Sequence, residues 1–244
     1  MNYKMKMAYD GTNYHGWQRQ KNGITVQEVL ENVLSEMFGK ETVVTGCSRT
    51  DAGVHAKIYV CNFSGETTIP ADKIPFVLNT KLPDDIRAYS CETVPEDFNA
   101  RFHTVTKAYE YKIVNRPFQD PLLRNFAWHY PVELDIGKMQ RAAKIIEGKH
   151  DFASFCAAGS VVKSTVRTVT ELTVKKEGDI ITVRAAADGF LYNMVRIIVG
   201  TLVYVGNGKL SENDIKELIE KKDRREMGIT APPQGLSLVE VNYE

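Results

Sequence analysis

Cysteine is scarce in this chain, and its spacing argues against two kinds of structural cross-link. The 244 residues contain four cysteines and five histidines. No two cysteines form a C-x-x-C pair and the histidines are scattered, so a structural zinc site is not predicted. A disulfide framework is not expected in a chain this long with so few cysteines. The sequence therefore predicts a reduced protein, long enough to bury a substantial core.

Long apolar runs are missing as well. The longest, MVRIIVGTLVYVG, contains Arg196 and is too short to span a bilayer. The N-terminal stretch MNYKMKMAYDG alternates apolar and polar side chains and lacks the apolar centre of a signal peptide. We therefore expect a cytoplasmic protein with no membrane partner.

Neither sign of charge is in excess. The chain has 31 Lys and Arg against 31 Asp and Glu, a formal net charge of zero. A neutral total neither indicates nor excludes an acidic partner, because a local patch can still be basic. Basic and aromatic residues alternate over residues 101–116, a composition typical of surfaces that hold phosphates and stack bases. Composition alone favours the simpler interpretation, a strand with one solvated face beside a core face.

The first half of the chain shows the order strand, helix, strand, strand, helix, strand. The clearest helix is predicted over residues 25–40, where apolar residues recur at helical spacing between Thr25 as N-cap and Gly39 as the stop. Pro75 weakens the helix predicted over 71–82. Strands are predicted at 3–11, 42–48, 56–65 and 85–94. The order βαββαβ is typical of ferredoxin-like units.

The second half repeats this order without repeating the sequence. Asp135 and Gly148 are placed to begin and end one of its helices. The predicted elements are a strand at 104–115, a helix at 135–148, a hairpin over 167–187 turning at 177–179, a buried helix at 190–206, an exposed helix at 211–222 and a strand at 235–243. We therefore expect a mixed α/β (α+β) chain of two ferredoxin-like subdomains, residues 1–100 and 101–244, around an extended, mainly antiparallel sheet, with the second completing an active-site cleft.

The stretch GCSRTDAGVHAK, residues 46–57, lies between two predicted strands. A loop fixed at both ends is a common position for reactive residues. Arg49 favours an ionised Asp51, and an ionised carboxylate acts as a base or a nucleophile. Gly53 permits either the close approach of a ligand or an unusual backbone angle. Taken alone, an Arg-Thr-Asp sequence is more typical of a surface turn. The motif contains no second acidic residue, which argues against a glycosidase that uses two carboxylates.

Other candidate sites are less specific. His55, like the other histidines, has no partner at metal-ligand spacing, which favours a structural role. The stretch YDGTNYHGWQRQ, with Tyr14 and Trp17, fits a binding loop and a loop folded onto the core equally well. Neither G-x-x-x-x-G-K-[ST] nor G-x-G-x-x-G occurs, so no phosphate-binding glycine loop is predicted.

Five motifs in order make the interpretation more specific. YDGTNYHGWQRQ, SRTDAGVHA, ARFHTVTKAYEY, NMVRIIVGTL and TAPPQGLSLVEVNY follow one another from Tyr9 to Tyr243. Each is weak or moderate alone, but together they resemble the tRNA pseudouridine synthase A family over nearly the whole chain. The resemblance implies an isomerase that cuts the N-glycosidic bond of a uridine in RNA, turns the base and rejoins it through carbon. It also implies two α/β subdomains around an extended sheet.

The resemblance assigns roles to particular residues of this sequence. Asp51 matches the essential catalytic aspartate, and Arg49 matches the arginine two residues before it. Tyr109 matches the tyrosine that stacks on the target base. Arg196 matches an arginine that pairs with the aspartate, and Leu238, preferred over its neighbour two residues earlier, matches an apolar residue of the pocket.

The resemblance also implies a substrate and an assembly. The substrate is the anticodon stem-loop of tRNA at positions 38, 39 and 40, the working unit is a homodimer, and no cofactor is used. Ser48, preceded by Cys47, stands where the family usually has glycine. This difference leaves the reactive residues in place, but the RNA substrate could differ from that of the family. The alternatives are the same reaction on another RNA, an RNA-binding protein without catalysis, and a carboxylate-dependent hydrolase.

Overall fold

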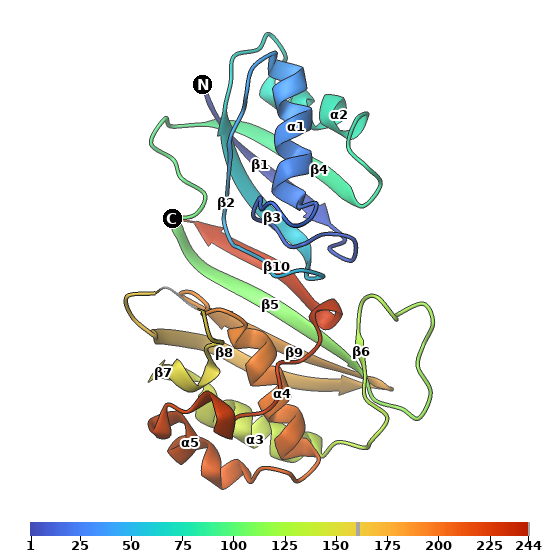
Figure 1. The fold of residues 1–244 in the computed structure, drawn as a ribbon, viewed down its shortest axis with the longest axis vertical. Helices are drawn as coiled ribbons and strands as arrows, with labels where there is room; N and C mark the ends of the chain where they lie inside the picture. Colours follow the sequence, from blue (N-terminus) through green and yellow to red (C-terminus); the bar gives the residue numbers. More distant parts are fainter. Residues whose placement is uncertain (160–161, 244) are drawn as a thin grey trace. The chain divides into compact units, whose positions relative to one another are not determined.

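The computed structural model describes residues 1–159 and 162–243, which form two compact units. The first unit contains Met1–Val105 and the chain from Ser237 onward, and the second contains Thr106–Leu236. Figure 1 labels the helices and strands of both. A functional division near residue 100 stays a prediction.

The first unit is built on a mainly antiparallel sheet. β1 (Asn2–Tyr9) lies between β3 (His55–Ser64) and β4 (Ile86–Val94), and β2 (Val44–Gly46) pairs with the second half of β3. Because β3 separates β1 from β2, these strands have the split βαβ arrangement. β10 (Leu236–Tyr243) pairs in parallel with the start of β3. The order of elements confirms the ferredoxin-like prediction for this unit.

Two helices accompany this sheet (Figure 1). α1 (Val26–Phe38) begins at Thr25, whose side-chain oxygen accepts a backbone hydrogen bond from the first turn, and ends at Gly39 in the left-handed conformation. Both ends are as predicted, since a hydroxyl satisfies a free N–H of the first turn and glycine adopts positive φ without strain. α2 (Ile74–Asn79) is shorter than predicted because a 3₁₀ turn precedes it and Pro75 lies in its first turn.

The second unit has its own antiparallel sheet in the order β5-β9-β8-β7. It contains β5 (Thr104–Val114), β7 (Gly148–Asp151), β8 (Val166–Glu177) and β9 (Ile180–Ala187), and β6 (Trp128–His129) pairs in parallel with β5. β6 and β7 were not predicted because two and four residues are too few to show an alternating pattern.

The helices of the second unit are α3 (Ile136–Ile146), α4 (Met194–Gly206) and α5 (Ile215–Lys221). Asp135 caps α3 as predicted, and the β8–β9 hairpin turns at Gly178, whose φ is 57°. α4 is almost wholly buried, as its apolar sequence predicts. The prediction of an exposed α5 is wrong, because one face of it is buried through Ile215, Leu218 and Ile219.

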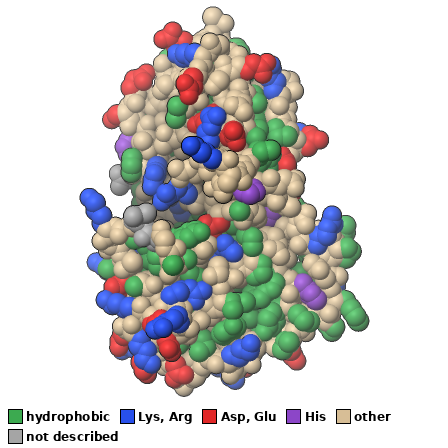
Figure 2. Space-filling view, in the orientation of Figure 1, with side chains coloured by type: hydrophobic (Ala, Val, Ile, Leu, Met, Phe, Trp, Pro, Cys, Tyr) green, Lys and Arg blue, Asp and Glu red, His purple; other side chains and the backbone are tan. Residues whose placement is uncertain are grey.

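The mixed α/β class and the mainly antiparallel strand pairing agree with the prediction. None of the four cysteines forms a disulfide among the described residues. Within residues 1–159 and 162–243, no helix is both long and apolar enough to cross a membrane. Figure 2 shows Lys and Arg side chains interspersed with Asp and Glu on the visible face of each unit, as a net charge of zero suggests.

Candidate active site

The predicted reactive loop joins β2 to β3 in the first unit. Its start is fixed where the N–H of Cys47 donates to the carbonyl of Val60 at 2.9 Å. Its end is a tight turn in which the N–H of Val54 donates to the carbonyl of Asp51 at 3.1 Å. Gly53 takes the third position of that turn with a φ of 76°, a conformation that glycine adopts without strain. Asp51 is thus held by a closed backbone turn.

A second loop, residues 10–24, packs against the reactive loop. The N–H of Trp17 donates to the carbonyl of Thr50 at 3.1 Å, and the N–H of Gly53 donates to the carbonyl of Tyr14 at 3.2 Å. A Cβ atom on Gly16 would lie 2.5 Å from the Thr50 carbonyl oxygen, so the two backbones meet at a distance that excludes any side chain here. The two loops therefore form one rigid structure.

The aromatic residues of that second loop belong to the core. Tyr14 and Trp17 are only 6% and 3% exposed. The Trp17 ring stacks on Tyr59 with 4.0 Å between ring centroids, and the Tyr59 hydroxyl donates a hydrogen bond to the carbonyl of Ser48. Of the two interpretations of YDGTNYHGWQRQ, the structure supports the loop folded onto the core.

The side chains of the Arg-Thr-Asp motif alternate in exposure. Arg49 is exposed, Thr50 is buried and its hydroxyl lies 2.8 Å from the Tyr9 hydroxyl, and Asp51 is half-buried. A buried central residue fixes the direction of its two neighbours. His55 is buried, and its ring Nδ1 lies 3.0 Å from both the backbone nitrogen of Gly11 and Oδ1 of Asp10. These contacts give His55 a structural role in joining the two loops.

The structure explains how Ser48 replaces the glycine usual in the resembling family. In the described part of the chain, positive φ outside glycine occurs at Asn193 and Lys222 only. The backbone at Ser48 therefore does not require glycine, and the hydrogen bond from the buried Tyr59 hydroxyl fixes its carbonyl whatever the side chain.

Leu238, on β10, is completely buried and in register with Ala56 of β3.

The second unit holds the predicted base-stacking residue. Tyr109 lies on β5 opposite Ala185 of β9 and is 6% exposed. Its ring packs edge-to-face against Phe190, with 5.2 Å between centroids and 87° between planes. Phe190 was not selected from the sequence, and its place beside the NMVR motif is the signal that points to it. The contact sets the orientation of the Tyr109 ring.

Hydrogen bonds to Ala231 and Asn193 hold Arg196 at the first turn of α4. Its Nε donates to the carbonyl of Ala231 at 2.7 Å, and its Nη1 donates to Oδ1 of Asn193 at 2.8 Å. Asn193 adopts the left-handed conformation with a φ of 60°, which asparagine tolerates better than most residues. Sequence reasoning missed Asn193, because an asparagine directly before a helix predicts an extended N-cap residue, whereas Asn193 is left-handed and its side chain makes no capping bond.

The TAPPQG motif packs against the same helix. A Cβ atom on Gly200 of α4 would lie 1.8 Å from the carbonyl oxygen of Ile229, the residue directly before this motif, so the helix and the chain entering the motif touch backbone to backbone. The Tyr111 hydroxyl donates to the carbonyl of Pro232 at 2.6 Å. Burial raises the pKa of Tyr111, which keeps its hydroxyl protonated as the donor. The segment whose Ala231 carbonyl accepts the hydrogen bond from Arg196 is therefore held in place by other contacts as well.

Comparison with known proteins identifies the family. A family model described as tRNA pseudouridine synthase matches residues 5–103 and 142–244. A protein of Thermoanaerobacter sp. (strain X514) named tRNA pseudouridine synthase A is 50% identical over 242 residues, covering 99% of each chain. Proteins of the same name from Ruminiclostridium cellulolyticum and Clostridium acetobutylicum are each 48% identical, covering 98% and 99% of both chains. The chain belongs to the tRNA pseudouridine synthase family.

Membership of this family confirms the prediction of an enzyme, an isomerase that acts on tRNA uridine. The first unit carries Arg49, Asp51 and Leu238, and the second carries Tyr109 and Arg196. Within residues 1–159 and 162–243, no group of three His, Cys, Asp or Glu side chains is arranged as metal ligands.

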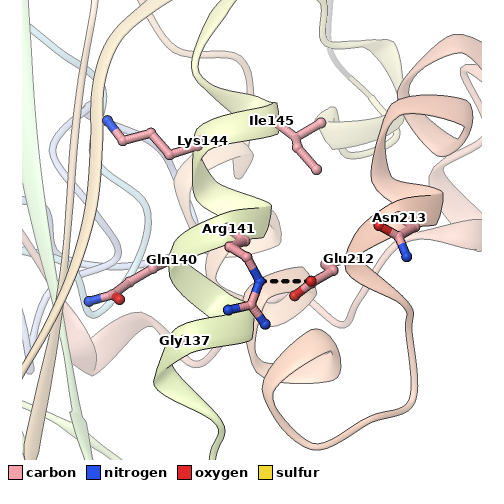
Figure 3. Close-up of a pocket in the computed structure, with 7 residues that line it drawn as sticks. All are labelled: Gly137, Gln140, Arg141, Lys144, Ile145, Glu212 and Asn213. Carbon is pink, nitrogen blue, oxygen red and sulfur yellow. Dashed lines mark hydrogen bonds and ion pairs between the residues drawn. The ribbon is translucent and has the colours of Figure 1, made fainter.

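A hollow of about 450 Å³ lies beside α3 in the second unit (Figure 3). Arg141 crosses it, and its Nε lies 2.7 Å from Oε1 of Glu212. The other Glu212 oxygen is buried and has no hydrogen-bond partner among the described residues. None of the five predicted site residues lines the hollow, whose wall consists of Gly137, Gln140, Arg141, Lys144, Ile145, Glu212 and Asn213.

Proposed function

We propose that the chain converts uridine to pseudouridine at positions 38, 39 and 40 of the tRNA anticodon stem-loop, with Asp51 as the reacting carboxylate. The observation that carries the proposal is the loop of Asp51, closed by its own turn and packed against a second loop at Thr50 and Gly53. A reacting carboxylate needs such a fixed position, because a misplacement of about 1 Å costs about 100-fold in rate.

The reaction matches the chemistry of one held carboxylate. Breaking the bond from C1′ to N1 and forming one from C1′ to C5 rearranges a single nucleotide, and N1 gains a proton as C5 loses one. The step needs an ionised carboxylate near C1′ and C6, and we propose that Arg49, two residues before Asp51, favours that charge state. No electron is gained or lost, so we propose that no cofactor takes part.

The target base has to leave its stack before it reacts, which costs a few kcal/mol. Tyr109 stacks on the extruded base, and stacking on an aromatic ring contributes about 1–3 kcal/mol. Phe190 keeps the Tyr109 ring in one orientation for that contact. Leu238 supplies an apolar contact, and the pairing of Arg196 with Asp51 that the resemblance implies stays a prediction.

Replacing Asp51 by Asn tests its role. We expect Asp51→Asn to abolish pseudouridine formation while tRNA binding largely survives, because the amide keeps the shape and loses the charge. Carbodiimide labelling of pseudouridine with primer extension measures the product, and filter binding measures affinity. Asp84→Asn is the control, since Asp84 is a fully exposed carboxylate of the same unit. Normal turnover by Asp51→Asn would remove Asp51 from the mechanism.

Cells that lack this protein test which tRNA positions it modifies. We expect tRNA from cells that lack this protein to lose pseudouridine at positions 38, 39 and 40 and to keep it elsewhere. Restoring the wild-type chain should return all three, and restoring Asp51→Asn should return none. Intact pseudouridine at these positions, with loss at a site in another RNA, would transfer the same reaction to that RNA.

A further inference from the structure

The segment between β4 and β5 contains a tightly built turn in the first unit. Oδ1 of Asn99 accepts hydrogen bonds from the N–H groups of Arg101 at 2.9 Å and Phe102 at 3.2 Å. The Asn99 carbonyl accepts a third from the N–H of His103 at 3.1 Å. An asparagine that bonds the backbone two and three residues ahead fixes a turn locally. Residues 101–103 therefore have a defined backbone.

The same turn is anchored to the core through Ala100, which is completely buried. Its N–H donates to Oδ1 of Asn62 on β3 at 2.8 Å. Its carbonyl accepts from the hydroxyls of Thr104 at 2.7 Å and Tyr243 at 2.8 Å. Three bonds to one buried residue hold the turn in place relative to the sheet of its unit.

The three residues that the turn displays do not serve the core. Phe102 is 76% exposed, and both Arg101 and His103 are exposed. The guanidinium carbon of Arg101 lies 5.7 Å from the centroid of the Phe102 ring, within cation–π range. In the described part of the chain no carboxylate pairs with Arg101. A rigid turn thus presents one aromatic face and one available positive charge to solvent.

We propose that this turn contacts tRNA, with Phe102 stacking on an unpaired base and Arg101 binding a neighbouring phosphate. Exposed aromatic rings stack on splayed bases of single-stranded RNA, and arginine binds the adjoining backbone. The turn is rigid before binding, so little conformational entropy is lost when the base stacks. The inference rests on the tRNA substrate of the proposed function and adds a contact outside its reacting residues.

The first unit offers a matched control residue. Phe76 on α2 is 68% exposed, and Nζ of Lys73 lies 5.4 Å from its ring centroid. Lys73, however, also pairs with Asp72, their charged atoms lying 3.2 Å apart. Phe76 is therefore exposed and lies near a cation, as Phe102 does. The cation near Phe76 is already paired with a carboxylate, which repels phosphate, whereas Arg101 near Phe102 is available to bind phosphate.

Filter binding of an unmodified tRNA transcript to the full chain tests the contact. We expect Phe102→Ala to weaken binding about tenfold and Phe76→Ala to leave it unchanged. Phe102→Trp should bind like the wild type, and Phe102→Leu should bind like Phe102→Ala, because only aromatic rings stack. Arg101→Gln should weaken binding and reduce the salt dependence by about one phosphate contact. Thermal unfolding should be unchanged in all of these variants, since the side chains of Phe102, Phe76 and Arg101 are exposed.

The outcomes separate this inference from the proposed function. Equal affinity of Phe102→Ala and Phe76→Ala, or full binding by Phe102→Leu, would overturn the stacking contact while pseudouridine formation by the wild type stands. Binding that depends on Phe102 without any pseudouridine formation by the wild type would support the contact and sink the proposed function. A wild-type chain that does not bind the transcript would overturn both.

Discussion

At the scale of single residues, backbone conformation explains several positions better than side-chain chemistry does. Gly16 is required because the Thr50 carbonyl occupies the space of its side chain, and Gly53 because its turn needs positive φ. Ser48, in contrast, tolerates a side chain because its φ is not positive. Asn193 combines both properties, since it adopts positive φ and its side chain accepts from Arg196.

Asn193 gives a prediction that separates these two roles. Asn193→Gly keeps the backbone free to adopt positive φ and loses the acceptor for Arg196, so we expect a lower kcat with nearly unchanged Tm. Asn193→Ala loses both and should also be about 1–2 kcal/mol less stable. Thermal unfolding and single-turnover pseudouridine formation measure the two effects. Full activity of Asn193→Gly would show that the hydrogen bond from Arg196 is dispensable.

At the scale of elements, helix ends were predictable and short strands were not. Thr25, Gly39 and Asp135 act as the sequence predicted, because capping depends on bonds within one turn. β6 and β7 depend on pairing with distant strands, which their few residues do not reveal. The buried face of α5 was missed because its apolar residues are only three in a charged helix.

Glu147 at the end of α3 gives a pH-dependent prediction. Its Oε2 accepts from the N–H of Leu172 on β8 at 3.0 Å, which with Lys144 lowers the pKa of Glu147 from its ordinary value of 4.5. A carboxylate with a lowered pKa stabilises the fold above its unfolded pKa and loses that effect as the pH falls through the folded value.

Urea unfolding at several pH values checks this effect. Wild type should be more stable than Glu147→Gln at pH 7, and the difference should shrink progressively below about pH 4.5. The exposed Glu133 provides the control, because Glu133→Gln should shift the urea midpoint little at any of these pH values. A difference for Glu147→Gln that grows on acidification would contradict the assignment of this bond.

At the scale of the whole molecule, the chain leaves its first unit at Thr106 and returns to it at Ser237. The last strand therefore completes the sheet that begins the chain, with Leu238 in register with Ala56 beside the reactive loop. A boundary drawn along the sequence does not show this return, because the pairing of β10 with β3 joins residues about 180 positions apart.

The homodimer proposed for this enzyme is a prediction at the same scale. We expect sedimentation equilibrium to give twice the mass of one chain at working concentration, with and without tRNA. Asp51→Asn should sediment identically, because an exchange of charge on a held loop leaves any subunit surface elsewhere unchanged. A single-chain mass with tRNA bound and pseudouridine forming would replace the dimer with an active monomer.

The sequence by itself determined the order of the longer helices and strands, the helix caps and the five motifs that resemble the family, since each depends on local spacing or on residue identity. Only the tertiary structure decided that Tyr14 and Trp17 support the reactive loop, that Asn193 and Ala231 hold Arg196, and that residues 101–103 are displayed by a fixed turn. These facts depend on contacts between segments far apart in the chain, and sequence patterns report such contacts only indirectly.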